Sequence, residues 1–367
     1  MTCHFRFMFR AVLALACSTA VGLAVIFSAN ANSASAQAID KDRPDTTANL
    51  ATAADPRRVV GNDACSKCHA AEMSVWDSTA HATTFNQLHR TPAAKQIASK
   101  LGLRSIKHSG RCVECHYTQQ ASHTTAPSTT PVAADAATNV IAGVSCESCH
   151  GAAKDWLDIH QDYGGANVTR LTESPAHRSD RLRRSIDAGM RNPANVYLVA
   201  QSCLRCHTTN DEQLVNVGGH SAGSLDFEFV AWSQGAIRHN FVRSDGSSNA
   251  ASSVERLRVM FVAGMIAELE ASLRATASAT EKATFGLTAA QRTYRAAKRL
   301  ISVTDKVDVD ELDEIVAIAA GARLKLNNQH ELIDAANRIA RLGIQFADAN
   351  DGSQLAALDT YLPPVTH

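Results

Sequence analysis

Helical spacing of apolar residues dominates the C-terminal third of the chain. Val254, Leu257, Phe261 and Met265 recur three or four residues apart, directly after Ser252-Ser253-Val254-Glu255, which has the form of a capping box. Similar spacing predicts further helices over 287–303, 310–326 and 331–346. We therefore expect residues 252–350 to form a C-terminal helical hairpin or small bundle that packs on the preceding part of the chain. Its expected role is stability or a docking surface.

The first 36 residues have the pattern of a secretory signal peptide. Arg6 and Arg10 precede an apolar run from Ala11 to Phe27, and Ala34-Ser35-Ala36 offers a small-residue cleavage site. This pattern predicts export, and therefore a periplasmic or other extracytoplasmic location. An uncleaved membrane anchor is the alternative, because the apolar run of 17 residues is near the lower limit for crossing a bilayer.

Two polar stretches interrupt the rest of the chain. Residues 37–58 are rich in Ala, Asp and Thr without apolar periodicity, which predicts a disordered linker. Residues 118–140 are dominated by Thr, Ala, Ser and Pro, which predicts a long surface loop. The segment 59–242 remains as one domain, and it contains every cysteine outside the signal peptide.

The cysteines of this domain are organised in pairs. Eight of the ten cysteines lie outside the signal peptide, and all eight belong to C-x-x-C pairs that are followed directly by His. The four motifs are Cys65-Ser66-Lys67-Cys68-His69, Cys112-Val113-Glu114-Cys115-His116, Cys146-Glu147-Ser148-Cys149-His150 and Cys203-Leu204-Arg205-Cys206-His207.

The C-x-x-C-H motif is typical of covalent haem attachment. The two thiols reach the vinyl groups of one porphyrin, and the adjoining imidazole lies under the iron as proximal ligand. Disulfides and zinc sites are the competing explanations for eight cysteines, but neither requires a histidine after every pair. We therefore predict four covalently bound haem c groups in a mainly α, multihaem c-type cytochrome domain with little regular sheet.

Composition and charge agree with this class. Aromatic residues make up only 5% of the chain, which leaves room for porphyrins in the interior. Removing residues 1–36 takes away two of the 36 basic residues and no acidic residue, which leaves a net charge of −2 before cofactors. No basic stripe suggests nucleic-acid binding, and that class is set aside.

Further histidines are available as sixth ligands of the irons. His81 follows His69 by 12 residues, and the segment from Ala70 to Phe85 is expected to be helical. A helix of that length spans about 18 Å, so His81 cannot easily reach the iron of its own motif. His160 follows His150 by 10 residues, about 15 Å in a helix, and the same argument applies. Each is expected to cap another motif's haem. His220 and His239, after the fourth motif, are the next candidates.

Two segments resemble the cytochrome c-554 family of tetrahaem proteins. They are GNDACSKCHAAEMSVWDSTAHATTF, residues 61–85, and VSCESCHGAAKDWLDIH, residues 144–160. The resemblance covers roughly residues 59–240 and implies a mainly helical electron carrier. It also implies that His81 pairs with His150 and His160 with His69, that the second haem is open at His116, and that His207 takes His220 or His239. Two late histidines stand where the family pattern needs one.

Two functions therefore compete. A periplasmic electron carrier would pass electrons between other redox proteins through four closely packed, mostly bis-histidine haems. A nitrogen-oxide redox enzyme would turn over nitric oxide or hydroxylamine at an open, five-coordinate second haem. A third interpretation makes the chain a subunit of a membrane-associated redox complex, with the C-terminal helices as its contact. We favour the carrier, without a catalytic residue, because distal histidines suffice for all four irons.

Overall fold

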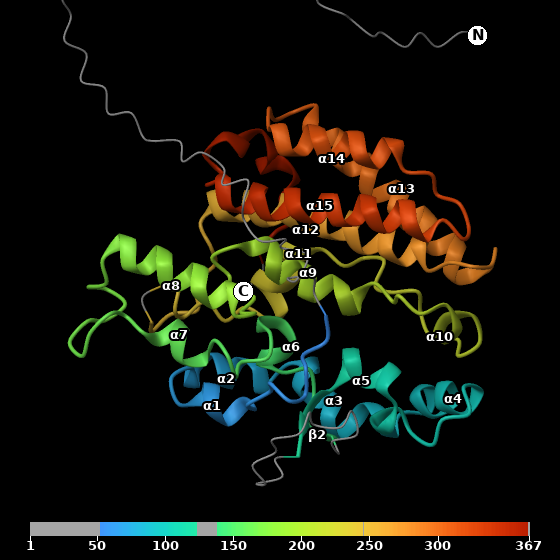
Figure 1. Ribbon diagram of the computed structural model, residues 1–367, viewed down its shortest axis with the longest axis horizontal. Helices are drawn as coiled ribbons and strands as arrows, with labels where there is room; N and C mark the ends of the chain where they lie inside the picture. The colour runs from blue at the N-terminus through green and yellow to red at the C-terminus, as the bar shows by residue number, and fades with distance from the viewer. Residues whose placement is uncertain (1–51, 123–137, 245, 366–367) are drawn as a thin grey trace, which may run out of the picture. The chain divides into compact units, whose positions relative to one another are not determined.

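The computed structural model describes residues 52–122, 138–244 and 246–365, all of which belong to one compact unit (Figure 1). The predicted signal peptide, most of the predicted linker 37–58 and the middle of the predicted loop 118–140 lie outside these residues. The fold is mainly α, as predicted, with a single two-stranded sheet among the described residues. No helix in the described ranges is long and apolar enough to cross a membrane.

Short helices make up the part of the chain that carries the cysteine motifs. In chain order they are α1 (Asn62–Ser66), α2 (Ala70–Asp77), α3 (Ala80–Gln87), η2 (Leu88–Arg90), α4 (Pro92–Lys100), η3 (Ile106–His108), α5 (Gly110–His116), α6 (Cys146–His150), α7 (Leu157–Gln161), α8 (Pro175–Asp187), α9 (Val196–His207), α10 (Glu212–Asn216), α11 (Phe229–Ala231) and the π-helical turn η4 (Trp232–Ala236). The motif histidine is the last helical residue of α5, α6 and α9. One helical turn therefore carries both thiols and the imidazole of each of these motifs.

The expected continuous helix over residues 70–85 is broken at its middle. Thr79 has an extended backbone conformation and caps α3 by accepting a hydrogen bond from the amide of Ala82. Its hydroxyl also donates to the carbonyl of Trp76 at 2.7 Å, at the end of α2. Because of this break, the chain changes direction before it reaches His81.

The ends of the predicted loop 118–140 form strands instead. β1 (Thr118–Ala121) and β2 (Thr138–Ala142) pair antiparallel, with Thr118 opposite Ala142 and a register irregularity after Thr118. The Thr118 hydroxyl donates to the carbonyl of Gly143 at 2.8 Å and contacts Ser148 of the third motif. The hairpin thus connects the second motif to the third.

Long helices make up the C-terminal region, as predicted. They are α12 (Val254–Ala277), α13 (Thr284–Thr304), α14 (Asp310–Gly321), α15 (Gln329–Ala349) and the 3-10 segment η5 (Ser353–Tyr361). The side chain of Ser253, one residue later than the expected capping box, accepts a hydrogen bond from the amide of Arg256 at the start of α12. α14 ends at Gly321, five residues before the predicted end.

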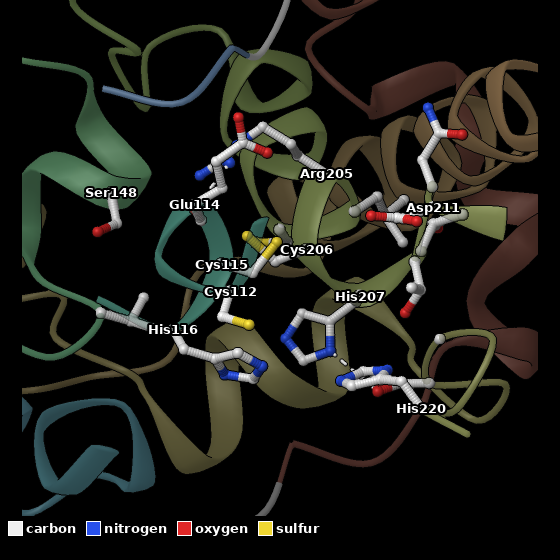
Figure 2. Close-up of a pocket in the computed structure, with 18 of the residues that line it drawn as sticks. Cys112, Glu114, Cys115, His116, Ser148, Arg205, Cys206, His207, Asp211 and His220 are labelled. Atoms are coloured by element: carbon white, nitrogen blue, oxygen red, sulfur yellow. Dashed lines mark hydrogen bonds between the residues drawn. The ribbon is translucent and has the colours of Figure 1, made fainter. Parts of the chain in front are cut away.

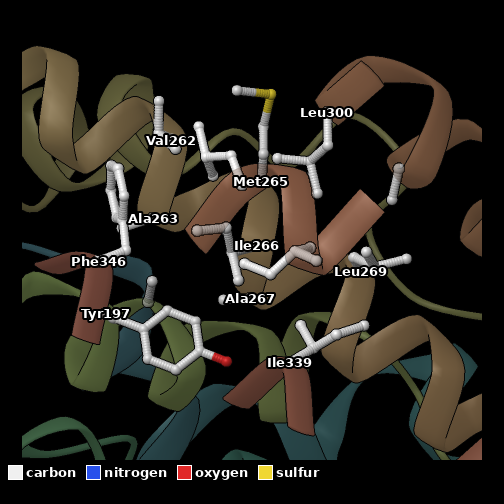
Figure 3. Packing of buried hydrophobic residues seen from close by; sticks show 14 of the residues in the cluster. Tyr197, Val262, Ala263, Met265, Ile266, Ala267, Leu269, Leu300, Ile339 and Phe346 are labelled. Atoms are coloured by element: carbon white, nitrogen blue, oxygen red, sulfur yellow. The ribbon is translucent and has the colours of Figure 1, made fainter. Parts of the chain in front are cut away.

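The main apolar core lies between these long helices and α9. Ile266 and Leu269 of α12 are fully buried, as are Tyr197 of α9 and Phe346 of α15 (Figure 3). The approach of α15 to Tyr197 requires glycine at position 343, because a Cβ there would lie 2.4 Å from the tyrosine ring. Since α9 ends in the fourth motif, this core is built directly onto a helix that carries a C-x-x-C-H motif.

Candidate haem-binding sites

Eight histidines meet in four pairs, and each pair combines one motif histidine with one histidine from elsewhere in the chain. Between ring centroids, His69 lies 6.4 Å from His160, His207 lies 6.3 Å from His81, His116 lies 6.1 Å from His220, and His150 lies 6.2 Å from His239. Every candidate ligand predicted from the sequence is therefore in a pair, and every motif contributes to one.

The separation within each pair is that expected for two imidazoles on opposite sides of one iron. Each metal–nitrogen bond takes about 2 Å, and the ring centre lies roughly 1.1 Å beyond the nitrogen, so two axial imidazoles have centroids about 6.2 Å apart. The four observed distances, 6.1 to 6.4 Å, agree with this value. The residues present therefore fit an iron held by two histidines at each motif.

Hydrogen bonds at Nδ1 orient several of these rings. Nδ1 lies 3.2 Å from the Arg191 carbonyl in His150, 2.8 Å from the Ser221 carbonyl in His220 and 2.6 Å from the Ile237 carbonyl in His239. A carbonyl only accepts, so Nδ1 carries the proton in each ring and Nε2 is left with its lone pair as the metal ligand. Nδ1 of His160 similarly donates to the Leu157 carbonyl.

Burial keeps three of the motif histidines neutral. Loss of hydration lowers the pKa of His116, His150 and His207 to about 4, with a smaller contribution from the facing histidines. Burial also lowers the pKa of His81 and His160. These imidazoles are therefore unprotonated at neutral pH, which is the form that binds a metal.

The histidine partners differ from those implied by the family resemblance in three cases. His160 faces His69, as implied. His81 does not face His150 but His207, because the break at Thr79 turns α3 toward α5, where the Thr84 hydroxyl donates to the His116 carbonyl at 3.0 Å. His150 faces His239 instead.

The second motif also departs from the implied arrangement. The resemblance implied an open position at His116 and a late histidine at His207, whereas in this structure His220 faces His116 and His81 faces His207. His220 follows two glycines, of which Gly219 has φ of +76°, and this tight turn brings its ring to His116. Among the remaining histidines, His177 lies 2.7 Å from Glu173 and not beside a motif, while His123 and His367 lie outside the described residues.

One cavity of about 900 Å³ contains two of the pairs. It is lined by His81, His116, His207 and His220 together with Cys112, Cys115, Cys203 and Cys206 (Figure 2). The cavity therefore has the second and fourth motifs on its walls, with thiols and imidazoles both directed to one space. This is the chemistry that covalent attachment and axial ligation of two neighbouring haems require.

Cysteines of different motifs lie next to one another. The thiols of Cys65 and Cys146 are within hydrogen-bonding reach, as are those of Cys115 and Cys206. The hydroxyl of Ser202, beside Cys203, donates to the Cys149 carbonyl at 2.9 Å. These contacts place the first motif beside the third, the third beside the fourth, and the fourth beside the second.

Disulfides and zinc sites were the competing explanations for the cysteines. The eight described cysteines form no disulfide. Within the ranges that the structure describes, no three His, Cys, Asp or Glu side chains converge as they would around zinc. The residues instead come together as pairs of imidazoles with separate pairs of thiols.

Two buried charged residues at the motifs were missed in the sequence. Glu147, inside the third motif, is only 1% exposed, and its carboxylate accepts from the amides of Val60, Gly61 and Ala153 at 2.8–3.0 Å. It thereby joins the first motif's segment to the third. Arg191 is buried beside His150 and donates to Gln201 at 2.6 Å. Neither residue has a sequence pattern that distinguishes it from a surface charge.

Two arginines beside the motifs are engaged with protein groups. Arg111 forms an ion pair with Asp211 at 2.7 Å, and Arg205 donates to the Glu114 carbonyl at 2.9 Å. Arg205 thereby links the fourth motif to the second.

A mainly α fold with four C-x-x-C-H motifs, each facing a second imidazole at axial separation, defines a c-type cytochrome. Residues 64–151 match the model of the family described as cytochrome c554 and c-prime. The chain is also 26% identical over 152 residues to cytochrome c-554 of Nitrosomonas europaea. That match covers 40% of this chain and 56% of the relative, and no solved structure shows a significant match. The resemblance predicted from the two segments is confirmed.

Proposed function

We propose that this protein is a tetrahaem electron carrier in which two histidines hold each iron. The observation that carries the proposal is the set of four histidine pairs with centroid separations of 6.1 to 6.4 Å. When bound, haem c supplies a reversible one-electron change at iron. Two protein ligands close both axial positions to exogenous molecules, and this favours electron transfer over catalysis.

The residues of the chain would hold the four groups in a fixed order. The contacts between neighbouring motifs support the order first, third, fourth, second, with each motif adjacent to the next. His160 joins the segment after the third motif to the first motif, and His81 joins the segment after the first motif to the fourth. The second and fourth motifs share one cavity. Such an arrangement supports transfer along the row, with the first and second motifs at its ends.

The location and partners follow from the chemistry of attachment. Covalent haem attachment and the sequence of residues 1–36 support a periplasmic protein after cleavage of the signal peptide. The carrier exchanges electrons with other redox proteins. Docking of the C-terminal helices in a membrane-associated redox complex is a secondary proposal that rests on their packing against α9 alone.

The enzyme alternative required an open second haem. His220 opposite His116 at 6.1 Å does not favour it, because this ring would hold the second axial position that a substrate needs. A carrier and an enzyme differ in a property that spectroscopy measures directly.

Ferric electron paramagnetic resonance of the purified protein, combined with a haem count, tests the proposal. We expect four haems per chain, low-spin signals only, and no spectral change on adding cyanide or nitric oxide. The His220→Ala variant should gain a high-spin signal from one haem. Replacement of the exposed His330, the matched control, should leave the spectrum unchanged. A high-spin signal in the unmodified protein would contradict complete bis-histidine ligation.

A further inference from the structure

The charges of this chain are unevenly distributed around the motifs. Residues 78–113 contain six Lys and Arg and no Asp or Glu, although the whole chain has 36 of each sign. This run covers α3, η2, α4, η3 and the start of α5. We call five of its cations the basic face: they are the exposed Arg90, Lys95, Lys100 and Arg104 and the half-buried Lys107.

The basic face lies over the second motif. α4 buries Ala94 and Ala98 against Cys112 and Val113, and it contributes Ala94 and Ile97 to the wall of the cavity that holds His116 and His220. Lys95 and Lys100 are exposed on the same helix. One helix, about 10 Å across, therefore separates the cavity from this positive surface.

Most of these cations have no acidic partner. Arg111 is the one cation of the run with an ion pair among the described residues, and its partner Asp211 belongs to the neighbouring segment. Lys107 lies over the Phe85 ring, 3.7 Å from its centroid. The nearest acids along the chain, Asp77 and Glu114, lie at either end of the run. The positive charge of the face is therefore not neutralised within the described structure.

Two further observations connect this charge with the surroundings of the second motif. Lys100 Nζ lies 3.0 Å from where a Cβ on Gly219 would be, so it adjoins the turn that presents His220. Burial lowers the pKa of His89, and the nearby Lys107 and Arg90 lower it further. The cations act together on groups around the second motif.

The opposite end of the motif row is different. Near the first motif, Arg57 pairs with Asp55 at 2.8 Å, and Arg58 pairs with Asp155. His69 itself lies 3.8 Å from Glu72. Side chains of both signs lie there, whereas residues 78–113, which lead into the second motif, carry positive charges only. The two ends of the row thus offer different surfaces to a partner.

We infer that the basic face is the docking site of an acidic redox protein that exchanges electrons with the haem of the second motif. This inference rests on the proposed function. A surface of one sign attracts a partner of the opposite sign and raises the association rate by about 10-fold to 1000-fold at low ionic strength. The face lies over a terminal haem of the row, where electrons enter or leave.

The test uses the holoprotein and an acidic plant-type ferredoxin as the probe. The triple variant Arg90→Glu, Lys95→Glu and Arg104→Glu reverses the face and spares Lys100, which touches the His220 turn. Stopped-flow measurement at low ionic strength should show reduction by ferredoxin at least about tenfold slower than in the unmodified protein. The difference should disappear as salt is added, because exposed charges are screened.

A matched control reverses three exposed cations elsewhere, Arg295 and Lys298 on α13 and Arg341 on α15. This triple variant should change the ferredoxin rate by less than about twofold. Equal rates for the two triple variants would overturn the inference. A second result would also overturn it: the unmodified protein binds anionic vesicles and the basic-face triple variant does not, while both are reduced by ferredoxin at the same rate. The face would then bind a membrane. A haem count below four would instead contradict the proposed function, independently of these rates.

Discussion

The motif-bearing segment and the C-terminal bundle differ in what lies between their helices. Before residue 250 the helices are mostly five to thirteen residues long, and the cavity between them is lined by thiols and imidazoles. After it, helices of 12 to 24 residues bury Leu, Ile, Val and Phe against one another. In the proposed holoprotein, porphyrins would take the place of side-chain burial in the first region, because haem supplies the apolar surface that short helices lack.

Removing the haem should produce the largest difference in structural order between the two regions. Protein produced without haem attachment should lose the ordered structure of residues 59–242, since the cavity would have no apolar filling. α12 to α15 should keep much of their helicity, because their core consists of side chains. Hydrogen exchange would measure this, with rapid exchange expected for α1 to α7 and protection for α12 and α15.

Protection of the bundle without haem depends on whether its core is stable in the absence of the cofactor. Equal loss of protection in both regions would show that α9, which is shared between them, makes the bundle depend on haem. The holoprotein examined in the same way provides the control.

A core substitution in the bundle should have the next largest effect. It should lower the stability of the bundle and leave haem ligation unchanged. Phe346→Ala removes a fully buried ring from α15 and should lower the free energy of unfolding by about 3–5 kcal/mol. Denaturant titration followed by circular dichroism measures this. The low-spin spectrum of the folded variant should be unchanged, because Phe346 is remote in sequence from every motif and belongs to the bundle core.

A truncation at an exposed position of the bundle is the appropriate comparison. Tyr294→Ala replaces a ring that is 64% exposed on α13 and should change stability by less than about 0.5 kcal/mol. A similar loss for both variants would contradict the assignment of the core to the inner faces of these helices.

These regions also differ in how far the sequence predicts them. The spacing of Val254, Leu257 and Phe261 predicts the bundle, because a helix that buries one face must repeat its apolar residues. The motifs predict the attachment points for a similar local reason, since two thiols and an imidazole act within one turn. Of the histidine pairs that the resemblance implied, only His69 and His160 face each other in the structure, because the other pairings depend on where the chain turns.

Three local features decided those turns. The Thr79 cap breaks a helix that residues 70–85 otherwise favour, and thereby sends His81 to His207. Gly219 allows the turn that brings His220 to His116. Glu147 joins the first and third segments through amides that any residue could present. None of these long-range contacts has a periodic pattern, so spacing alone could not predict them.

The smallest expected effect comes from changing charged residues of the bundle that lie near α9. The property affected is the reduction potential. Glu270 of α12 is 4% exposed, lines the cavity, and accepts hydrogen bonds from Tyr197 and Gln201 at 2.6 Å. Arg292 of α13 is 2% exposed and donates to the carbonyl of His207 at 3.1 Å. An anion stabilises ferric iron and a cation stabilises ferrous iron, so the bundle acts on the fourth haem with both signs.

Neutralising these two residues should therefore shift the potential in opposite directions. Glu270→Gln should raise the potential of the fourth haem and Arg292→Gln should lower it, each by about 1 kcal/mol, or roughly 40 mV for a one-electron couple. Spectroelectrochemical titration measures both, with the low-spin spectrum as the check that ligation is intact. If the bundle only stabilises the fold, both variants should shift the unfolding midpoint and leave all four potentials in place. Shifts of opposite sign in one haem would instead show that the side-chain core and the haem row are coupled electrostatically through α9.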